Sequence, residues 1–141
     1  MEKSTHIPDS SHTLTFHMSK IVPGTFKQVI EKITEELRKE GFGIISSIDL
    51  RKTFKKKIAV EFRNYTILGA CNPQYAYEAI SLEDKIGIFL PCNVVVQQHE
   101  NENVEVSIVN PEELMHGIDD LNIRDFATDI KEAMQNVLNR L

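Results

Sequence analysis

The sequence predicts an α+β protein with a mainly antiparallel five-stranded sheet and helices packed on one face of that sheet. Two segments with apolar residues at helical spacing lie near the two ends of the chain, over residues 25–40 and 123–141. Segments with the composition of strands fill the region between them. Runs of strands bounded by helices are typical of this fold class. With 141 residues and 41% hydrophobic content, the chain fits one domain, which we expect over residues 12–141 after a flexible tail of residues 1–11.

The first two elements are a strand and an amphipathic helix. TLTFHMSK alternates, with Leu14, Phe16 and Met18 on one face, and Pro23-Gly24 ends it. Thr25 is the expected N-cap of the helix, because Gln28 stands three residues later in capping-box spacing. The apolar stripe of this helix comprises Phe26, Val29, Ile30, Ile33 and Leu37.

Four further strands are predicted, over residues 43–50, 65–70, 86–98 and 104–109. RKTFKKK, with five basic residues in seven, interrupts the pattern as a helical turn or a loop. Its charge could bind an anionic group or an acidic partner, although a solvated loop has the same composition. The final helix, 123–141, has an apolar stripe of Phe126, Ile130, Met134, Val137 and Leu141.

Composition narrows the function classes. A net charge of −5 argues against a nucleic-acid partner. No apolar run reaches the roughly 18 residues of a membrane span, and the N-terminus has no secretory signal. We therefore expect a cytoplasmic protein without a membrane partner, in which the two cysteines are free thiols rather than a disulfide. No motif indicates a cofactor.

The two cysteines carry the strongest site signal. Each is followed by asparagine and has a proline alongside, in Cys71-Asn72-Pro73 and Pro91-Cys92-Asn93. Asn72 suits an N-cap and Pro73 the first turn of a short helix that ends near Leu82. A thiol beside a helix N-terminus is a candidate nucleophile or soft-metal ligand, although free cysteine is also a common core residue. Cys92 falls in an apolar row. Pro91 and Asn93 interrupt their strand, as residues of a pocket wall would.

Whether the two thiols meet depends on the pairing of the third and fourth strands. Parallel strands would place Cys71 and Cys92 at similar heights. Antiparallel strands starting at Tyr65 and Ile86 would place Cys92 six residues from Cys71, about 20 Å at ~3.3 Å per residue. No CxxC or HxxxH grouping accompanies the thiols, so we expect no metal site.

The segments FKQVIEKITEELRKEGFGIISSIDLRKTFKKK, YTILGACNPQYAYEAI, IGIFLPCNVVVQ and VEVSIVNPEEL together resemble the domain-of-unknown-function family numbered 302. The resemblance covers the chain from about Leu14 to Leu141. It implies a fold similar to that of the TATA-binding protein (strand, helix, four strands, helix), antiparallel central strands, and a homodimer. It implies no established activity. The family usually has an aspartate where this chain has Asn110.

Three hypotheses about function follow. The first is a non-enzymatic, homodimeric module that binds a small molecule or a protein partner near Cys71, Asn72, Pro73, Pro91, Cys92 and Asn93. The second is redox, sulfur-transfer or metal chemistry centred on Cys71, with Cys92. The third is a purely structural dimer. The accessibility of Cys71, and its closeness to a pocket, discriminates among them.

Overall fold

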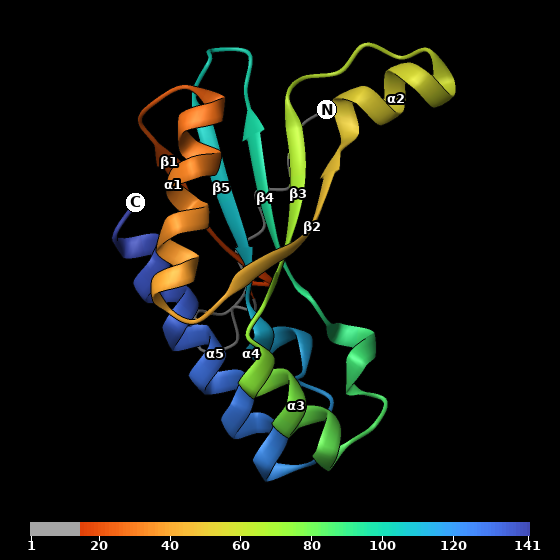
Figure 1. The fold of residues 1–141 in the computed structure, drawn as a ribbon, viewed down its shortest axis with the longest axis vertical. Coiled ribbons are helices and arrows are strands. Elements are labelled where there is room, and N and C mark those ends of the chain that lie inside the picture. The colour runs from red at the N-terminus through yellow and green to blue at the C-terminus, as the bar shows by residue number, and fades with distance from the viewer. Residues whose placement is uncertain (1–14) are drawn as a thin grey trace, which may run out of the picture.

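The structure, a computed structural model, describes residues 15–141. The expected N-terminal tail and the first residues of the predicted first strand, including Leu14, lie outside the described residues. Five strands form one antiparallel sheet in the order β1-β5-β4-β3-β2, which confirms the predicted fold class (Figure 1). The strands are β1 (His17–Val22), β2 (Gly43–Asp49), β3 (Tyr65–Cys71), β4 (Cys92–Gln98) and β5 (Val104–Val109).

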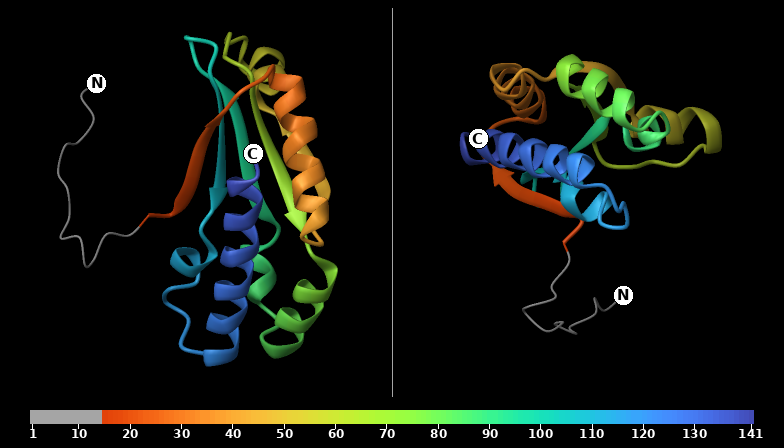
Figure 2. Two further views of the ribbon diagram at one scale, coloured as in Figure 1. Left: turned by 90° about the vertical axis from the view of Figure 1, so that its left-hand side faces the viewer. Right: turned by 90° about the horizontal axis from the view of Figure 1, so that it is seen from below.

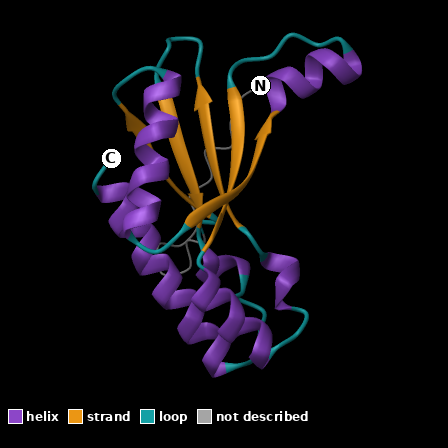
Figure 3. Cartoon of the chain, viewed as in Figure 1, coloured by secondary structure: helices purple, strands orange, loops and turns teal. Residues whose placement is uncertain are grey.

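Helices follow or separate the strands (Figure 3), and the helices of residues 86–89 and 111–114 were not predicted. The two long helices are α1 (Phe26–Lys39) and α5 (Leu121–Asn139). The shorter ones are α2 (Leu50–Ile58), α3 (Pro73–Leu82), the 3₁₀ helix η2 (Ile86–Phe89) and α4 (Pro111–Leu114). None of the helices in residues 15–141 combines the length and the apolar character needed to span a membrane.

The core lies between α1, α5 and one face of the sheet (Figures 1 and 2). Alternate strand residues point to this face because side chains in a strand alternate with a period of two. Leu68 of β3, Val94 of β4 and Ile108 of β5 stand in one row across the three central strands, and all are buried. None of the described helices covers the opposite face.

Helix α1 begins as the sequence predicts. The Thr25 hydroxyl accepts the Gln28 backbone N–H at 3.1 Å, and the Gln28 side chain accepts the Thr25 N–H at 2.9 Å. The chain leaves the helix at Gly41 with φ of 87°, a left-handed conformation that suits glycine.

Lys20 of β1 contacts the C-terminal end of α5. Its ammonium donates to the carbonyls of Leu138 and Leu141, where the dipole of α5 favours a cation.

The fourth strand is shorter than predicted. Residues 86–89 form η2, with the Ile88 N–H bonded to the Lys85 carbonyl and the Leu90 N–H to the Gly87 carbonyl. The Leu90–Pro91 peptide is cis, and β4 begins only at Cys92. Pro91 has no N–H to offer a strand ladder, so the apolar run divides there. The first strand also begins later than predicted, and Phe16 is 75% exposed instead of facing the core.

The basic segment is a helix. Asp49 caps α2 by accepting the Lys52 N–H at 3.0 Å, and α2 ends at Ala59 in the left-handed conformation, with φ of 56°. Phe54 packs edge to face on Phe62, with ring centroids 5.1 Å apart, and this contact anchors the helix to the returning chain. Figure 1 shows that α2 projects from the body of the protein.

Asn110 ties the start of β1 to α4. Its backbone N–H donates to the Phe16 carbonyl at 2.8 Å, and its Nδ2 donates to the Thr15 carbonyl at 3.0 Å. Its Oδ1 accepts the Glu112 N–H at 3.1 Å, which caps α4. The side chain is 6% exposed, so each of these bonds satisfies a group that water reaches poorly.

Asn110→Asp should lower the free energy of unfolding by about 1–3 kcal/mol at neutral pH, because a carboxylate oxygen would replace the donor that faces the Thr15 carbonyl. Chemical denaturation measures this, and the deficit should shrink in acid, where a protonated aspartate can donate. Asn101→Asp is the matched control, since Asn101 uses only its oxygen, to accept the Asn103 N–H. Equal stabilities of the two variants would contradict the assigned role of Asn110.

Candidate functional site

Cys71 and Asn72 lie where β3 passes into α3. Cys71 is the last residue of β3 and is half-buried. The Asn72 Oδ1 accepts the N–H groups of Gln74 and Tyr75 at 3.1 and 3.2 Å, with Pro73 exposed in the first turn. Asn72 therefore performs the capping role that the sequence predicts. Its Nδ2 would lie 2.9 Å from a Cβ at Gly41, so the turn after α1 and the start of α3 need a glycine at that contact.

Cys92 lies beside the end of β3. The strands β3 and β4 are antiparallel, as the resemblance implies, and Cys92 pairs directly with Ala70. The separation of about 20 Å expected for antiparallel strands is therefore wrong. It assumed that the fourth strand starts at Ile86, whereas η2 takes up residues 86–89 and the pairing starts at Cys92. The two cysteines are neighbours across the pair and are both free thiols.

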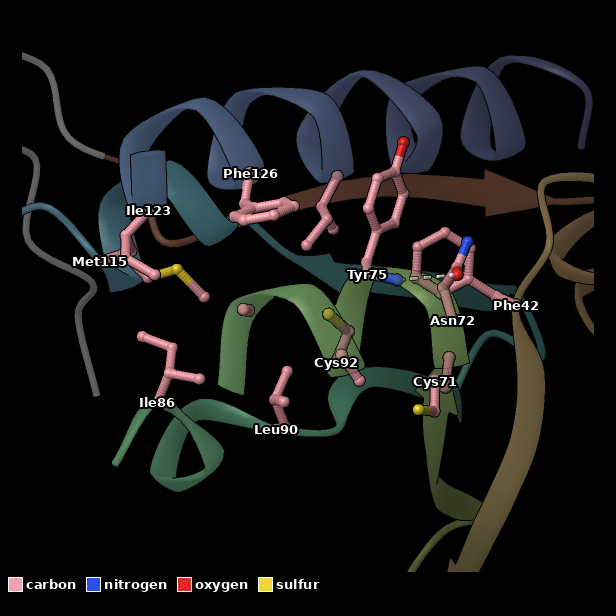
Figure 4. A pocket seen from close by; sticks show the side chains of 14 residues that line it. Phe42, Cys71, Asn72, Tyr75, Ile86, Leu90, Cys92, Met115, Ile123 and Phe126 are labelled. Carbon is pink, nitrogen blue, oxygen red and sulfur yellow. Dashed lines mark hydrogen bonds between the residues drawn. The ribbon is translucent and has the colours of Figure 1, made fainter. Parts of the chain in front are cut away.

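The cysteine segments border a small interior cavity between the end of the sheet, α3 and α5 (Figure 4). Cys71, Asn72 and Cys92 line it, together with Tyr75, Phe126 and Met115. Its volume is about 20 Å³ and its walls are almost wholly apolar. A cavity of this size holds about one water molecule, and sites for small organic ligands are larger, ~300–1,000 Å³. The arrangement has the character of a packed core end and offers no ligand pocket of that size.

Burial controls the chemistry of Cys92. The side chain is 4% exposed, and this desolvation, with a smaller contribution from the nearby Cys71 thiol, raises the pKa of Cys92 to about 11. The thiolate is the nucleophile and the metal ligand, so Cys92 is held in its unreactive form at neutral pH. Residues 15–141 contain no cluster of three or more His, Cys, Asp or Glu side chains that could hold a metal ion.

Asn93, the asparagine that follows Cys92, lies on the other face of the sheet. Asn93 is exposed and lies in a groove of about 430 Å³ on the face of the sheet opposite the core. Pro91 stands at the edge of the same face, where its ring packs over Gly69; a Cβ there would approach the Pro91 Cγ to 2.8 Å. The six residues singled out from the sequence thus divide between the two sides of the sheet.

A hydrogen-bonded row of side chains crosses this groove. The Nδ1 of His17 lies 2.7 Å from the Ser19 hydroxyl, which lies 2.7 Å from the Ser107 hydroxyl. Gln97 and Glu105 also line the groove, and the carboxylate of Glu105 bonds the His99 ring at 2.9 Å. Within residues 15–141, no carboxylate hydrogen-bonds His17, so the row lacks the orienting acid of a catalytic triad. It can donate and accept hydrogen bonds to a bound molecule.

Sequence reasoning missed this groove. The signal was present in the residues that alternate with the buried ones, namely His17 and Ser19 on β1 and Ser107 on β5. Their convergence requires the register that pairs Ser19 with Ser107, two residues 88 positions apart.

Comparison with known proteins places this fold in a family. The sequence profile described as "Domain of unknown function DUF302" matches residues 18–141. The chain belongs to the DUF302 family. The crystal structure of an uncharacterized conserved DUF302 protein from Bacillus stearothermophilus is similar, with a TM-score of 0.84 and 29% identity over 90% of this chain and 98% of that chain. No curated protein matches the chain.

Native Cys92 should resist thiol reagents. In the Cys71→Ser variant, the rate of reaction with a disulfide reagent at about pH 8 should be at least ~100-fold lower in the folded protein than in denaturant. A rise in pKa from 9.0 to about 11 lowers the thiolate fraction by this factor, and burial slows access further. Cys92→Ser, which leaves the half-buried Cys71, is the paired measurement. Fast labelling of native Cys92 would contradict its burial.

Proposed function

We propose that this DUF302 protein is a non-enzymatic binding module that works as a homodimer. Its recognition surface is the face of the sheet that none of the described helices covers, which we call the uncovered face. The observation that carries the proposal is the groove of about 430 Å³ on that face, with a hydrogen-bonded row of polar side chains at its centre. This moves the proposed binding site from the cysteine segments to the opposite side of the sheet, and of the six candidate residues only Asn93 lines the groove.

The uncovered face is more apolar than an antiparallel sheet exposed to water needs to be. One row of side chains crosses all five strands in register: Ile48, Ile67, Val95, Ser107 and Ser19. Its first half is entirely aliphatic. Phe16, 75% exposed, and Ile21, 48% exposed, lie toward the β1 side of the same face. Apolar patches of this kind, rimmed by polar groups, are typical of interaction surfaces.

A second copy of the chain fits this face in size and charge. Five strands at ~4.8 Å spacing and six residues at ~3.3 Å make a flat area on the order of 500 Å², which the relief of the side chains enlarges toward the ~800 Å² per partner of a standard interface. Lysine and arginine are absent from the groove lining, and its one carboxylate, Glu105, is paired with His99. The grooves of two such faces can therefore meet without strong repulsion between like charges.

Such a dimer would also complete the ligand site. Within residues 15–141, the groove of one copy is open to solvent, whereas small-molecule sites bury most of their ligand. A second face laid over it would form the missing wall. The lining suits a small molecule with an apolar body, which packs on Val95 and Val109, and one or two polar groups, which bond Ser19, Ser107 or Asn93.

Val95→Lys should convert the dimer to a monomer, because it places an unpaired cation at the centre of the interface. Light scattering during size-exclusion chromatography measures the mass, and circular dichroism checks the fold. Ile88→Lys is the control, since Ile88 is 80% exposed on η2, away from the sheet face. A monomeric wild-type protein, or a dimeric Val95→Lys variant, would contradict the proposed interface.

Small aromatic fragments that each carry one hydrogen-bonding group test the groove. Their binding is detected by changes in the amide chemical shifts of the protein. Binding should move the resonances of Ser19, Asn93 and Ser107, and Ser107→Trp, which fills the groove, should abolish the effect. Cys71→Ser, which alters the interior cavity, should leave it unchanged. Shifts confined to α3 and α5, with fast labelling of Cys71, would favour the hypothesis of cysteine chemistry instead.

A further inference from the structure

Charge is strongly segregated along this chain. Residues 49–63, which comprise α2 and its flanks, hold six Lys or Arg and two Asp or Glu, a net charge of +4. Because the whole chain carries −5, the remaining residues carry −9. The net positive charge is therefore confined to the segment around α2, which projects from the body (Figure 1), and the rest of the chain is net acidic.

The cations of residues 49–63 differ in their freedom to bind a partner. The two arginines are engaged by the body: Arg51 donates to the Asn64 side chain at 3.0 Å, and Arg63 donates to Gln97 and lies over the Phe62 ring at 4.4 Å. Lys55 is paired with Glu61. Lys52, Lys56 and Lys57 are exposed and line a shallow surface beside Ser47 and Ile48.

Aliphatic side chains stand next to these lysines at the far end of α2. Ile58, its last residue, is 63% exposed, and Val60 in the turn that follows is 42% exposed. Phe54 and Phe62 pack against each other and support this end of the helix. Ile58 and Val60 remain exposed among the described residues. An exposed aliphatic tip flanked by lysines combines the two attractions of a peripheral membrane contact, namely apolar insertion and binding of anionic headgroups.

We propose that α2 docks the protein on a membrane surface that contains anionic lipids, with Ile58 and Val60 entering the headgroup region and Lys52, Lys56 and Lys57 facing the lipid phosphates. This inference revises the expectation of no membrane partner, which rested on the lack of a membrane-spanning segment, and it does not depend on the proposed ligand groove. Each lysine near an anionic surface strengthens binding roughly fivefold.

The acidic body of the protein would be repelled by an anionic membrane, and the projection of α2 reduces this repulsion. Nine residues at ~1.5 Å rise make a helix about 13 Å long, which exceeds the screening length of ~8 Å at physiological ionic strength. Helix α2, which forms a projecting arm, can contact a planar anionic surface while much of the acidic body lies beyond the range of strong repulsion. Nucleic acid fits less well, because lysine is a point charge without the bidentate geometry of arginine, and the aliphatic tip offers no stacking surface for bases.

The test is co-sedimentation of the full-length protein with vesicles of phosphatidylcholine alone and of phosphatidylcholine mixed with phosphatidylglycerol. Binding should require phosphatidylglycerol and fall as salt is raised. Lys52→Gln, Lys56→Gln and Lys57→Gln together should weaken it roughly 100-fold. The matched control replaces Lys27, Lys32 and Lys85, three lysines outside the arm that are also exposed, and should change binding only slightly. Ile58→Ser should weaken binding, whereas Ile88→Ser, on η2, should not.

Equal binding to both vesicles, insensitivity to salt, or the same loss in the control triple variant would overturn the proposal. A competition experiment with single-stranded DNA tests whether α2 binds nucleic acid instead of a membrane. If the oligonucleotide binds more tightly than the anionic vesicles and displaces the protein from them, α2 is a nucleic-acid contact and the membrane proposal is wrong.

Discussion

The rest of the structure depends on one constraint, namely the burial of alternate strand residues beneath α1 and α5. Leu68, Val94 and Ile108 stand in register and are fully covered. A slip of one residue in a central strand would move these buried side chains to the other face, and in β5 it would bury Glu105 and Ser107 in their place, so the register is strongly specified. The helices are held in turn by the buried Glu36 of α1, which the Arg140 guanidinium contacts at 2.6 Å after the end of α5. The same contact, with Lys39, holds the pKa of Glu36 below its ordinary value.

That constraint assigns the two chemical features of the chain to opposite sides of the sheet. Cys92 shares the covered face, and its thiol is therefore desolvated and protonated. The strand positions that alternate with the buried ones include His17, Ser19 and Ser107. These side chains remain accessible on the other face. The echo of Cys-Asn in the sequence suggested one site, but consecutive strand residues point in opposite directions. Cys92 and Asn93 therefore belong to different environments.

The cysteine segments have a sufficient structural explanation. Asn72 caps α3, Pro73 occupies its first turn, and Pro91 marks the break that starts β4. Tyr75 completes the end of the core between Phe42 and Phe126, with ring centroids 6.4 and 6.2 Å away. The same residues seal the interior cavity at about 20 Å³. A site that must admit a ligand has more room, and the groove on the uncovered face provides it.

Local patterns in the sequence determined most of the elements. The capping box at Thr25, the Asn72-Pro73 helix start and the alternation in β5 act through neighbouring residues, so they can be recognised without a tertiary structure. Three features were decided only by the fold. Pro91 marks the break in the apolar run 86–98, but residues 86–89 form a helix because Ile86 of η2 packs with Ile123 and Met115 in a small apolar cluster separate from the main core. The closeness of Cys71 to Cys92 follows from that division, and the row of Ser19 and Ser107 follows from pairing across 88 residues. Periodicity reports which side of its own element a residue occupies, whereas a site depends on which elements become neighbours.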